Sequence, residues 1–246
     1  MNASGCSRIP SELSYWITFL TKALPPRSIG TFIELLIGSM LTVTGFVTDA
    51  YSVIDMQNKW FSYYKWLQEE KWSWLSLARQ FVRLCLMVIR ADVIHLAIDD
   101  TLTLRSSRKA PGSKYPHQHG NKPNLANYVW GQCWVSLALI ASRADKTPVG
   151  LPLLSRLIPS STNTGKLIAA NTLIRAVCGL LKAMPVRVLV DSWYMRKRFI
   201  ENMRRQTTVN SMELCAVQSF HSPTSQPHKQ TLIQTTHRYH RSPSWR

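Results

Sequence analysis

Two short apolar segments that each end in aspartate constrain the fold of this chain most strongly. "VIHLAI", residues 93–98, runs into Asp99 and Asp100, and "VRVLV", residues 186–190, runs into Asp191. Both are rich in aliphatic and β-branched residues, which predicts buried strands. "TNTGKLIAANTLIRAVCGLLKAM" lies between them and has an amphipathic helical pattern. Because a strand that follows a crossover helix lies parallel to an earlier one, we expect the aspartates at neighbouring strand ends.

Other segments of residues 91–205 predict further strands and a helix around these two strands. "YVWGQCWVSLALIAS" and "TPVGLPLLSRLIP" predict two more strands, the second at an edge or a bend because of its prolines. "YMRKRFIENMRR" predicts a basic helix. The order β-β-β-α-β-α predicts an α/β fold with a mixed sheet over residues 91–205.

The first 90 residues have a different texture. Residues 1–27 predict a loose leader that ends near two prolines, and residues 28–90 predict a helical domain. Three helices are expected there, in "TFIELLIGSML", "SVIDMQNKWFSYYKWLQEE" and "KWSWLSLARQFVRLCLMVIR". Glu34 follows Thr31 at the spacing of a capping box. The apolar stretches fall short of the roughly 20 residues that span a bilayer, so buried helices are favoured.

The charge of the chain favours a polyanionic partner. Its formal net charge is +17, and residues 91–205 carry 17 basic and 6 acidic side chains. Such an excess suits nucleic acid or an anionic membrane surface. The five cysteines are scattered with no CxxC, which argues against a disulfide framework or a zinc site and fits a reducing cytosol.

Two carboxylates at adjacent strand ends can share divalent metal ions. Mg²⁺ prefers oxygen ligands and takes one or two protein carboxylates together with phosphate oxygens and water. Two such ions can activate a water or hydroxyl and stabilise the leaving oxygen of a phosphodiester. The alternative is that Asp100 and Asp191 cap a turn or a helix, and the spacing alone leaves both interpretations open.

Basic residues near the aspartates are candidates for contact with a DNA backbone, with solvated loops as the alternative. His117 and His119 form an H-x-H pair, for which phosphate contact or a solvated loop is favoured over metal binding. Lysines interleave four tryptophans between Trp60 and Trp74, where a helical core is favoured over DNA stacking. The candidate DNA-binding residues are Arg105, Arg108, Lys109, Lys114, His119, Lys122, Arg196, Lys197 and Arg198.

Several of these segments resemble one family. "IDDTLTLRSSRKAPG", "HQHGNKPNLANYVWGQCWVSLAL" and "VRVLVDSWY" resemble the DDE superfamily transposases of bacterial insertion sequences. The resemblance covers roughly residues 28–205 and implies an RNase H-like catalytic core behind a helical N-terminal domain. It implies that Asp100, which precedes the Thr of the "DDT" motif, and Asp191 are the first two catalytic, metal-binding acids. It also implies Mg²⁺ or Mn²⁺ as the cofactor of intact members.

The family's third acid, a Glu on a later helix, has no clear counterpart here. Glu201 and Glu213 are the acids that follow Asp191, and neither stands in a family-like position. The segment 206–246 is rich in Ser, Thr and His with one acid, and such a composition predicts low order. We interpret it as a frameshifted tail, so that the core over 91–205 is partial. A genuine basic, DNA-contacting tail is the alternative.

These observations predict a transposase fragment, truncated at the C-terminus, with little or no catalysis. The activity implied for intact members is DNA transposition by metal-dependent strand cleavage and transfer. The alternative is a non-catalytic DNA-binding protein that competes with an intact transposase. The expected partners are DNA (transposon ends) and a second copy or an intact transposase, with no membrane. The expected location is the bacterial cytoplasm, at the nucleoid. Whether this chain binds the metal stays open.

Overall fold

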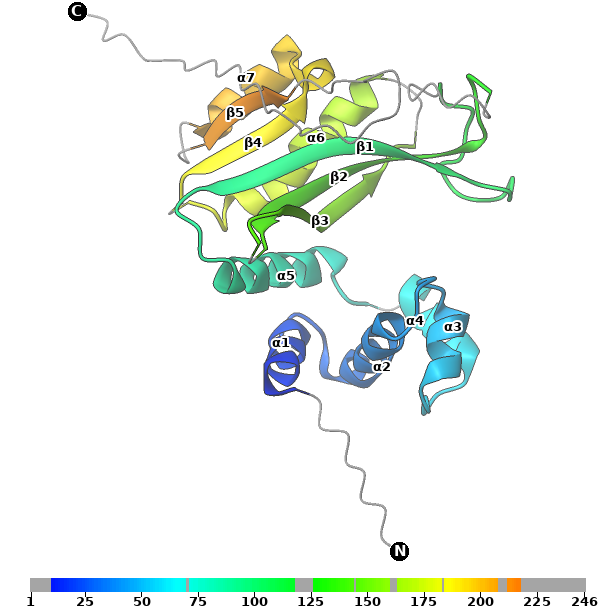
Figure 1. The fold of residues 1–246 in the computed structure, drawn as a ribbon. Helices are drawn as coiled ribbons and strands as arrows, with labels where there is room; N and C mark the ends of the chain where they lie inside the picture. Colours follow the sequence, from blue (N-terminus) through cyan, green and yellow to red (C-terminus); the bar gives the residue numbers. More distant parts are fainter. Residues whose placement is uncertain are drawn as a thin grey trace, which may run out of the picture. The chain divides into compact units, whose positions relative to one another are not determined.

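The computed structural model describes residues 10–69, 71–117, 126–143, 145–159, 163–182, 184–207 and 212–217. The chain divides into two compact units, residues 1–88 and 89–246. Figure 1 shows helices in the first unit and a sheet with two long helices in the second. This is the mixed α/β class that the sequence predicts, and it is consistent with an RNase H-like fold.

The first unit contains α1 (Ser11–Thr21), the 3-10 turn η1 (Pro26–Ser28), α2 (Ile29–Met40), α3 (Val47–Val53), α4 (Trp60–Glu69) and α5 (Trp74–Val88). Helix α1 lies inside the segment expected to be a loose leader. It forms there because Ile17 and Leu20 are buried on one face. Gln80 of α5 also donates a hydrogen bond to the carbonyl of Phe19.

Two details of the helical unit differ from expectation. The stretch predicted as one helix from Ser52 is divided between α3 and α4. The capping box is absent, because Thr31 lies inside α2 and Glu34 instead accepts hydrogen bonds from the Tyr63 hydroxyl and the Gln57 backbone. Trp66 is buried and stacks on Trp72, which confirms a core role for that part of the tryptophan cluster.

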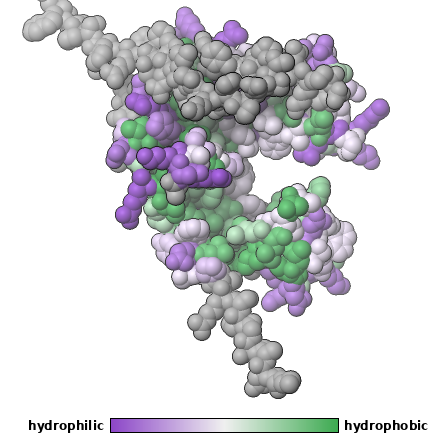
Figure 2. Space-filling model, in the orientation of Figure 1, coloured by the Kyte–Doolittle hydropathy of each residue, from purple (hydrophilic) through white to green (hydrophobic). Residues whose placement is uncertain are grey.

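The surface of the helical unit carries an apolar patch. Met40, Leu41, Val43 and Phe46, around the connection from α2 to α3, are exposed. Figure 2 shows apolar residues gathered on this unit. No helix among the described residues is long and apolar enough to cross a membrane.

The second unit is built on five strands and two helices. The strands are β1 (Ile94–Leu104), β2 (Gly131–Ser142), β3 (Pro148–Leu157), β4 (Val186–Asp191) and β5 (Met212–Val217). Their order in the sheet is β3-β2-β1-β4-β5. Helices α6 (Asn163–Cys178) and α7 (Lys197–Thr207) pack against each other and lie on the same face of the sheet (Figure 1). The 3-10 turn η2 (Ser192–Tyr194) follows β4 directly.

Both kinds of strand pairing occur in this sheet. β1 and β2, and β2 and β3, are antiparallel, whereas β1 and β4, and β4 and β5, are parallel. The predicted parallel neighbours are therefore β1 and β4, with α6 as the crossover. The core lies under the helices and contains alternating residues of the central strands: Ile94, Leu96, Ile98, Val135, Leu137, Leu139, Val186, Val188 and Val190.

Strand β5 was not predicted. It lies within 206–246, where the sequence led us to expect low order, and this corrects that expectation for residues 212–217. Of its residues only Met212 is fully buried, so its own pattern is weak. The free edge of β4 supplies the partner that makes it a strand, and every residue from Val186 to Asp191 pairs with it. The frameshift hypothesis itself stays a prediction.

Candidate active site

The aspartates of the "IDD" segment lie within β1 and not at its end. The parallel pairing with β4 runs from Ile94 to Ile98, whereas the antiparallel pairing with β2 carries β1 on to Leu104. Asp191 is the last residue of β4. Ile98 pairs with Val190, so Asp99 and Asp191 each follow one residue later on adjacent strands. The topology thus brings the three aspartates to one region of the sheet.

The register separates these aspartates by face. Ile94, Leu96 and Ile98 are buried, and side chains alternate along a strand, so Asp100 continues the face covered by the helices. Val190 is buried on that same face, so Asp191 follows on the opposite side. Asp99 shares that side with Asp191. The sequence motifs alone do not distinguish these two faces.

Asp100 lies in a polar cluster beneath the helices. Lys166, in the first turn of α6, places its Nζ 2.7 Å from Asp100 Oδ2. The Tyr194 hydroxyl donates to Asp100 Oδ1 at 3.1 Å, and the Cys133 thiol lies 3.8 Å from Oδ2. The Lys166 and Asp100 side chains are only 16% and 24% exposed. Asp100 is therefore held from α6, from η2 and from β2.

The donors around Asp100 stay protonated at neutral pH. Burial raises the pKa of the Cys133 thiol to about 11, and the negative charge of Asp100 adds to the effect. Burial also raises the pKa of Tyr194 far above its ordinary value, again with a contribution from the Asp100 charge. Both groups therefore keep the hydrogen that each can donate to the carboxylate.

Asp99 and Asp191 are bound only by local groups in the described structure. Asp99 Oδ1 accepts from the Asp100 backbone N–H at 2.8 Å, and Asp191 Oδ1 accepts from the Ser192 hydroxyl at 3.0 Å. Although Asp99 is exposed as a residue, partial desolvation of its carboxylate raises its pKa, and the charges of Asp100 and Asp191 raise it further. Asp191 makes no side-chain cap bond to η2, so the capping alternative has no support there.

The ring of Trp193 contacts two cationic side chains beside Asp100. Lys166 Nζ lies 5.3 Å from the centre of the Trp193 ring, and the Arg196 guanidinium lies 5.8 Å from it. Arg196 also donates from Nε to the Trp193 carbonyl. Cation–π contact of this kind holds basic side chains in place next to the carboxylates.

Neither later glutamate joins the aspartates. Glu213 of β5 forms an ion pair with Arg187 of β4 at 2.9 Å. Glu201 is exposed on α7. Across the described ranges, no group of three or more His, Cys, Asp and Glu side chains is arranged to hold a metal ion.

The predicted DNA-contacting residues fall into two groups in the described structure. Arg108, Lys109 and Lys114 are exposed on the loop that follows β1, and Arg105 is exposed but fixed through its Nε to the Gln132 amide. Arg196, Lys197 and Arg198 are exposed at the start of α7. His119 and Lys122 lie outside the described residues.

Lys166 and Tyr194 are not among the predicted site residues. The "NTGK" segment lacks the glycine spacing of a phosphate-binding loop, so its lysine carries no motif that would select it. Its lysine instead reaches the sheet from α6. Tyr194 follows Asp191 by three residues, and η2 turns it under β1. A lysine in the first turn of a crossover helix is the one signal that could have indicated the contact.

Comparison with solved structures gives a distant likeness. The chain is similar to a piggyBac transposase solved in a synaptic complex with hairpin DNA, at 15% identity and a TM-score of 0.34. The likeness covers 87% of this chain, which spans only 43% of that protein's length. No curated protein matches the chain significantly.

A comparison with family models gives a broader result. The model described as DDE superfamily endonuclease matches residues 41–244, which is most of the chain and includes β1, β4 and the aspartates that they carry. The match begins in the helical unit and continues beyond Gln206, through β5. The chain therefore belongs to the family of DDE superfamily endonucleases.

Proposed function

We propose that this chain is part of a bacterial insertion-sequence transposase that binds DNA and holds a divalent metal ion through Asp100 and Asp191. The single observation that carries the proposal is the parallel pairing of β1 and β4, which brings the "IDD" and "VLVD" segments together within a DDE superfamily endonuclease. The net charge of +17 supports DNA as the partner.

The donor set fits a hard divalent ion. Asp99, Asp100 and Asp191 offer carboxylate oxygens, which are the ligands that Mg²⁺ and Mn²⁺ prefer, from two adjacent strands. Asp100 faces the helices, whereas Asp99 and Asp191 face the other side of the sheet, so an ion shared by Asp100 and Asp191 would lie where β4 ends at Asp191. Of these three aspartates, only Asp100 has a cationic partner among the described ion pairs, and neither Asp99 nor Asp191 is paired. When bound, the metal supplies activation of a water or hydroxyl and charge stabilisation at the phosphodiester.

The chain's own residues have separate tasks in this proposal. Asp100 and Asp191 bind the ion. Lys166 of α6 and Tyr194 of η2 each contact one oxygen of the Asp100 carboxylate and so orient it. The exposed basic residues of the loop after β1 and of the start of α7 hold the DNA backbone, because phosphate contacts supply most of the affinity and position the strand.

We further propose that the chain is catalytically incomplete. The two acids that follow Asp191 are poorly placed to complete the site, since Glu213 is neutralised by Arg187 and Glu201 is exposed on α7. A protein that binds transposon ends without cutting them would compete with an intact transposase, or would pair with it. In this view the tail beyond Gln206 derives from a shifted reading frame, although β5 pairs in the sheet and the family match continues to residue 244. Translation of the neighbouring frame tests that point, and the absence of a family-like C-terminal region there would refute it.

Two assays on one preparation test the function. DNA binding is measured with a labelled transposon-end duplex, and nicking is measured on supercoiled plasmid with Mg²⁺ or Mn²⁺, for the wild type, Asp100→Ala and Asp191→Ala. The proposal expects binding by all three proteins and little or no nicking. Nicking that disappears in both variants would show a competent site and refute incompleteness. If the wild type does not bind DNA, the proposed function is wrong.

A further inference from the structure

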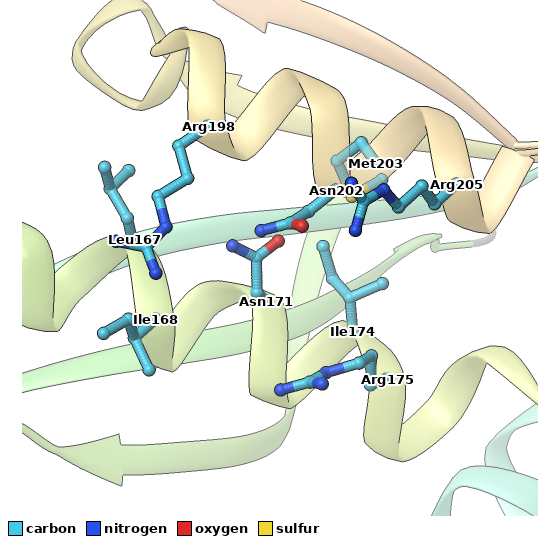
Figure 3. A pocket seen from close by; sticks show the side chains of 9 residues that line it. All are labelled: Leu167, Ile168, Asn171, Ile174, Arg175, Arg198, Asn202, Met203 and Arg205. Atoms are coloured by element: carbon cyan, nitrogen blue, oxygen red, sulfur yellow. The ribbon is translucent and has the colours of Figure 1, made fainter.

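A pocket between α6 and α7 is separate from the residues that hold Asp100. It has a volume of about 390 Å³ and is lined by residues of both helices. Figure 3 shows the side chains that line it, which project from α6 on one wall and from α7 on the other. A volume of this size is in the range of small-ligand sites.

The polar lining of the pocket consists of three arginines and two asparagines. Arg198, Asn202 and Arg205 recur at a helical spacing on α7, so they share one face. Asn171 and Arg175 stand at the same spacing on α6. In Figure 3 the amides of Asn171 and Asn202 approach each other between the helices, while Arg198 and Arg205 descend from α7.

Within the described part of the chain, the three arginines of the pocket have no acidic partner. The described ion pairs join Lys65 to Glu69, Lys166 to Asp100 and Arg187 to Glu213. Glu201 is close in sequence to the α7 arginines, but it does not line the pocket. Arg175, Arg198 and Arg205 are exposed and border one hollow, and three positive charges there favour an anion as the ligand.

The side chains that line the pocket indicate which class of anion it would bind. Guanidinium forks match phosphate oxygens in a bidentate way. The asparagine amides offer both donors and acceptors, which suit a sugar hydroxyl or a base edge. Leu167 and Ile168 add apolar surface above the buried Ile174 and Met203. Together these features fit a nucleotide, with its phosphate on the arginines and its less polar parts against the helices.

We propose that the α6–α7 pocket binds a nucleotide unit through its phosphate, and that the unit belongs to a DNA strand. The assignment to a strand rests on the proposed function. It is supported by the position of α6, since Lys166 at the carboxylates directly precedes Leu167 at the pocket.

The test compares Arg175→Gln combined with Arg205→Gln against a charge-matched control, Arg143→Gln combined with Lys182→Gln. The control residues are exposed and do not line the pocket. Each full-length protein is titrated with a labelled DNA duplex over a range of salt concentrations. Each phosphate contact contributes about 0.9 to the slope of log affinity against log salt. The pocket variant is expected to lose about 1 to 2 from this slope relative to the control, with each single Arg→Gln variant losing about half of that.

A second experiment distinguishes a free nucleotide from a DNA strand as the ligand of the pocket. Its result can be interpreted even if the proposed function is wrong. A deoxynucleoside monophosphate is added while the side-chain amide signals of Asn171 and Asn202 are followed by NMR. Shifts in the wild type that vanish in the pocket variant support a nucleotide site, even if the wild type binds no DNA. Such shifts with an unchanged salt slope would overturn the DNA strand as the source. Unchanged slopes and unchanged amide signals would overturn the pocket altogether.

Discussion

The ammonium of Lys166 lies 2.7 Å from the carboxylate of Asp100, which ties the first turn of α6 to the central strand of the sheet. The pair is mostly shielded from solvent, since both side chains are less than a quarter exposed. Lys166 thus contacts one of the carboxylate oxygens that a divalent ion would use. Stability and metal binding are therefore expected to oppose each other at this residue.

Lys166→Met should lower the free energy of unfolding by about 1–2 kcal/mol, because a partly buried carboxylate loses its cationic partner. Urea unfolding in the absence of divalent ions measures the change. Lys182→Met, at an exposed lysine, is the control and should have almost no effect. If Lys166→Met and Lys182→Met unfold at the same urea concentration, the ion pair contributes nothing.

The same Lys166→Met variant should bind Mn²⁺ about fivefold more tightly than the wild type, since the ion no longer displaces an ammonium worth about 1 kcal/mol. The free Mn²⁺ signal in electron paramagnetic resonance gives the affinity. An affinity equal to or weaker than that of the wild type would show that Lys166 does not compete for Asp100.

Tyr194→Phe should destabilise the protein by about 1 kcal/mol, because the Asp100 carboxylate loses a hydrogen bond while the buried ring keeps its contacts with Trp193 and Phe199. Thermal unfolding measures the loss. Tyr128→Phe, at an exposed tyrosine, provides the comparison. A Tyr194→Phe protein as stable as the wild type would mean that Asp100 does not depend on this hydroxyl.

Asp99→Asn should raise the unfolding temperature at pH 7 and have little effect near pH 3. The pKa of Asp99 is raised in the fold by desolvation and by the neighbouring carboxylates, so its contribution to stability is complete below its ordinary pKa and is lost as pH rises through the folded value. An ionised Asp99 is therefore unfavourable at neutral pH, and asparagine removes that cost.

Asp145→Asn gives the opposite sign and serves as the control. Hydrogen bonds from Thr147 lower the pKa of Asp145, so its contribution is present at neutral pH and is lost on acidification. The two variants should thus shift the unfolding temperature in opposite directions at pH 7. A stabilising effect of Asp99→Asn that persisted at pH 3 would contradict the electrostatic cause.

The sequence predicts the central sheet well because its signals are local. The apolar runs before Asp99 and Asp191, with a crossover helix between them, suffice to make β1 and β4 parallel neighbours. Strand β5 escapes such reasoning because "MELCAV" has only one fully buried residue, and its partner is the edge of a strand more than twenty residues away. Helix α1 escapes because its burial depends on α5, which is distant in sequence.

The site is predictable only in part for the same reason. The motifs select Asp100 and Asp191 as candidates, but the face on which each lies depends on the register of two strands. That register places Asp99 beside Asp191 and turns Asp100 toward Lys166. Apart from its place in the first turn of the crossover helix, nothing in "NTGK" indicates that its lysine reaches a carboxylate 66 residues earlier in the chain.

The most direct test of the account is the affinity for Mn²⁺ of Asp99→Asn, Asp100→Asn and Asp191→Asn, measured beside the wild type on the full chain. If Asp100 and Asp191 hold the ion, those two variants lose binding while Asp99→Asn keeps most of it. If Asp99→Asn and Asp191→Asn lose binding and Asp100→Asn keeps it, the ligand from β1 is Asp99, and the central assignment of Asp100 is contradicted.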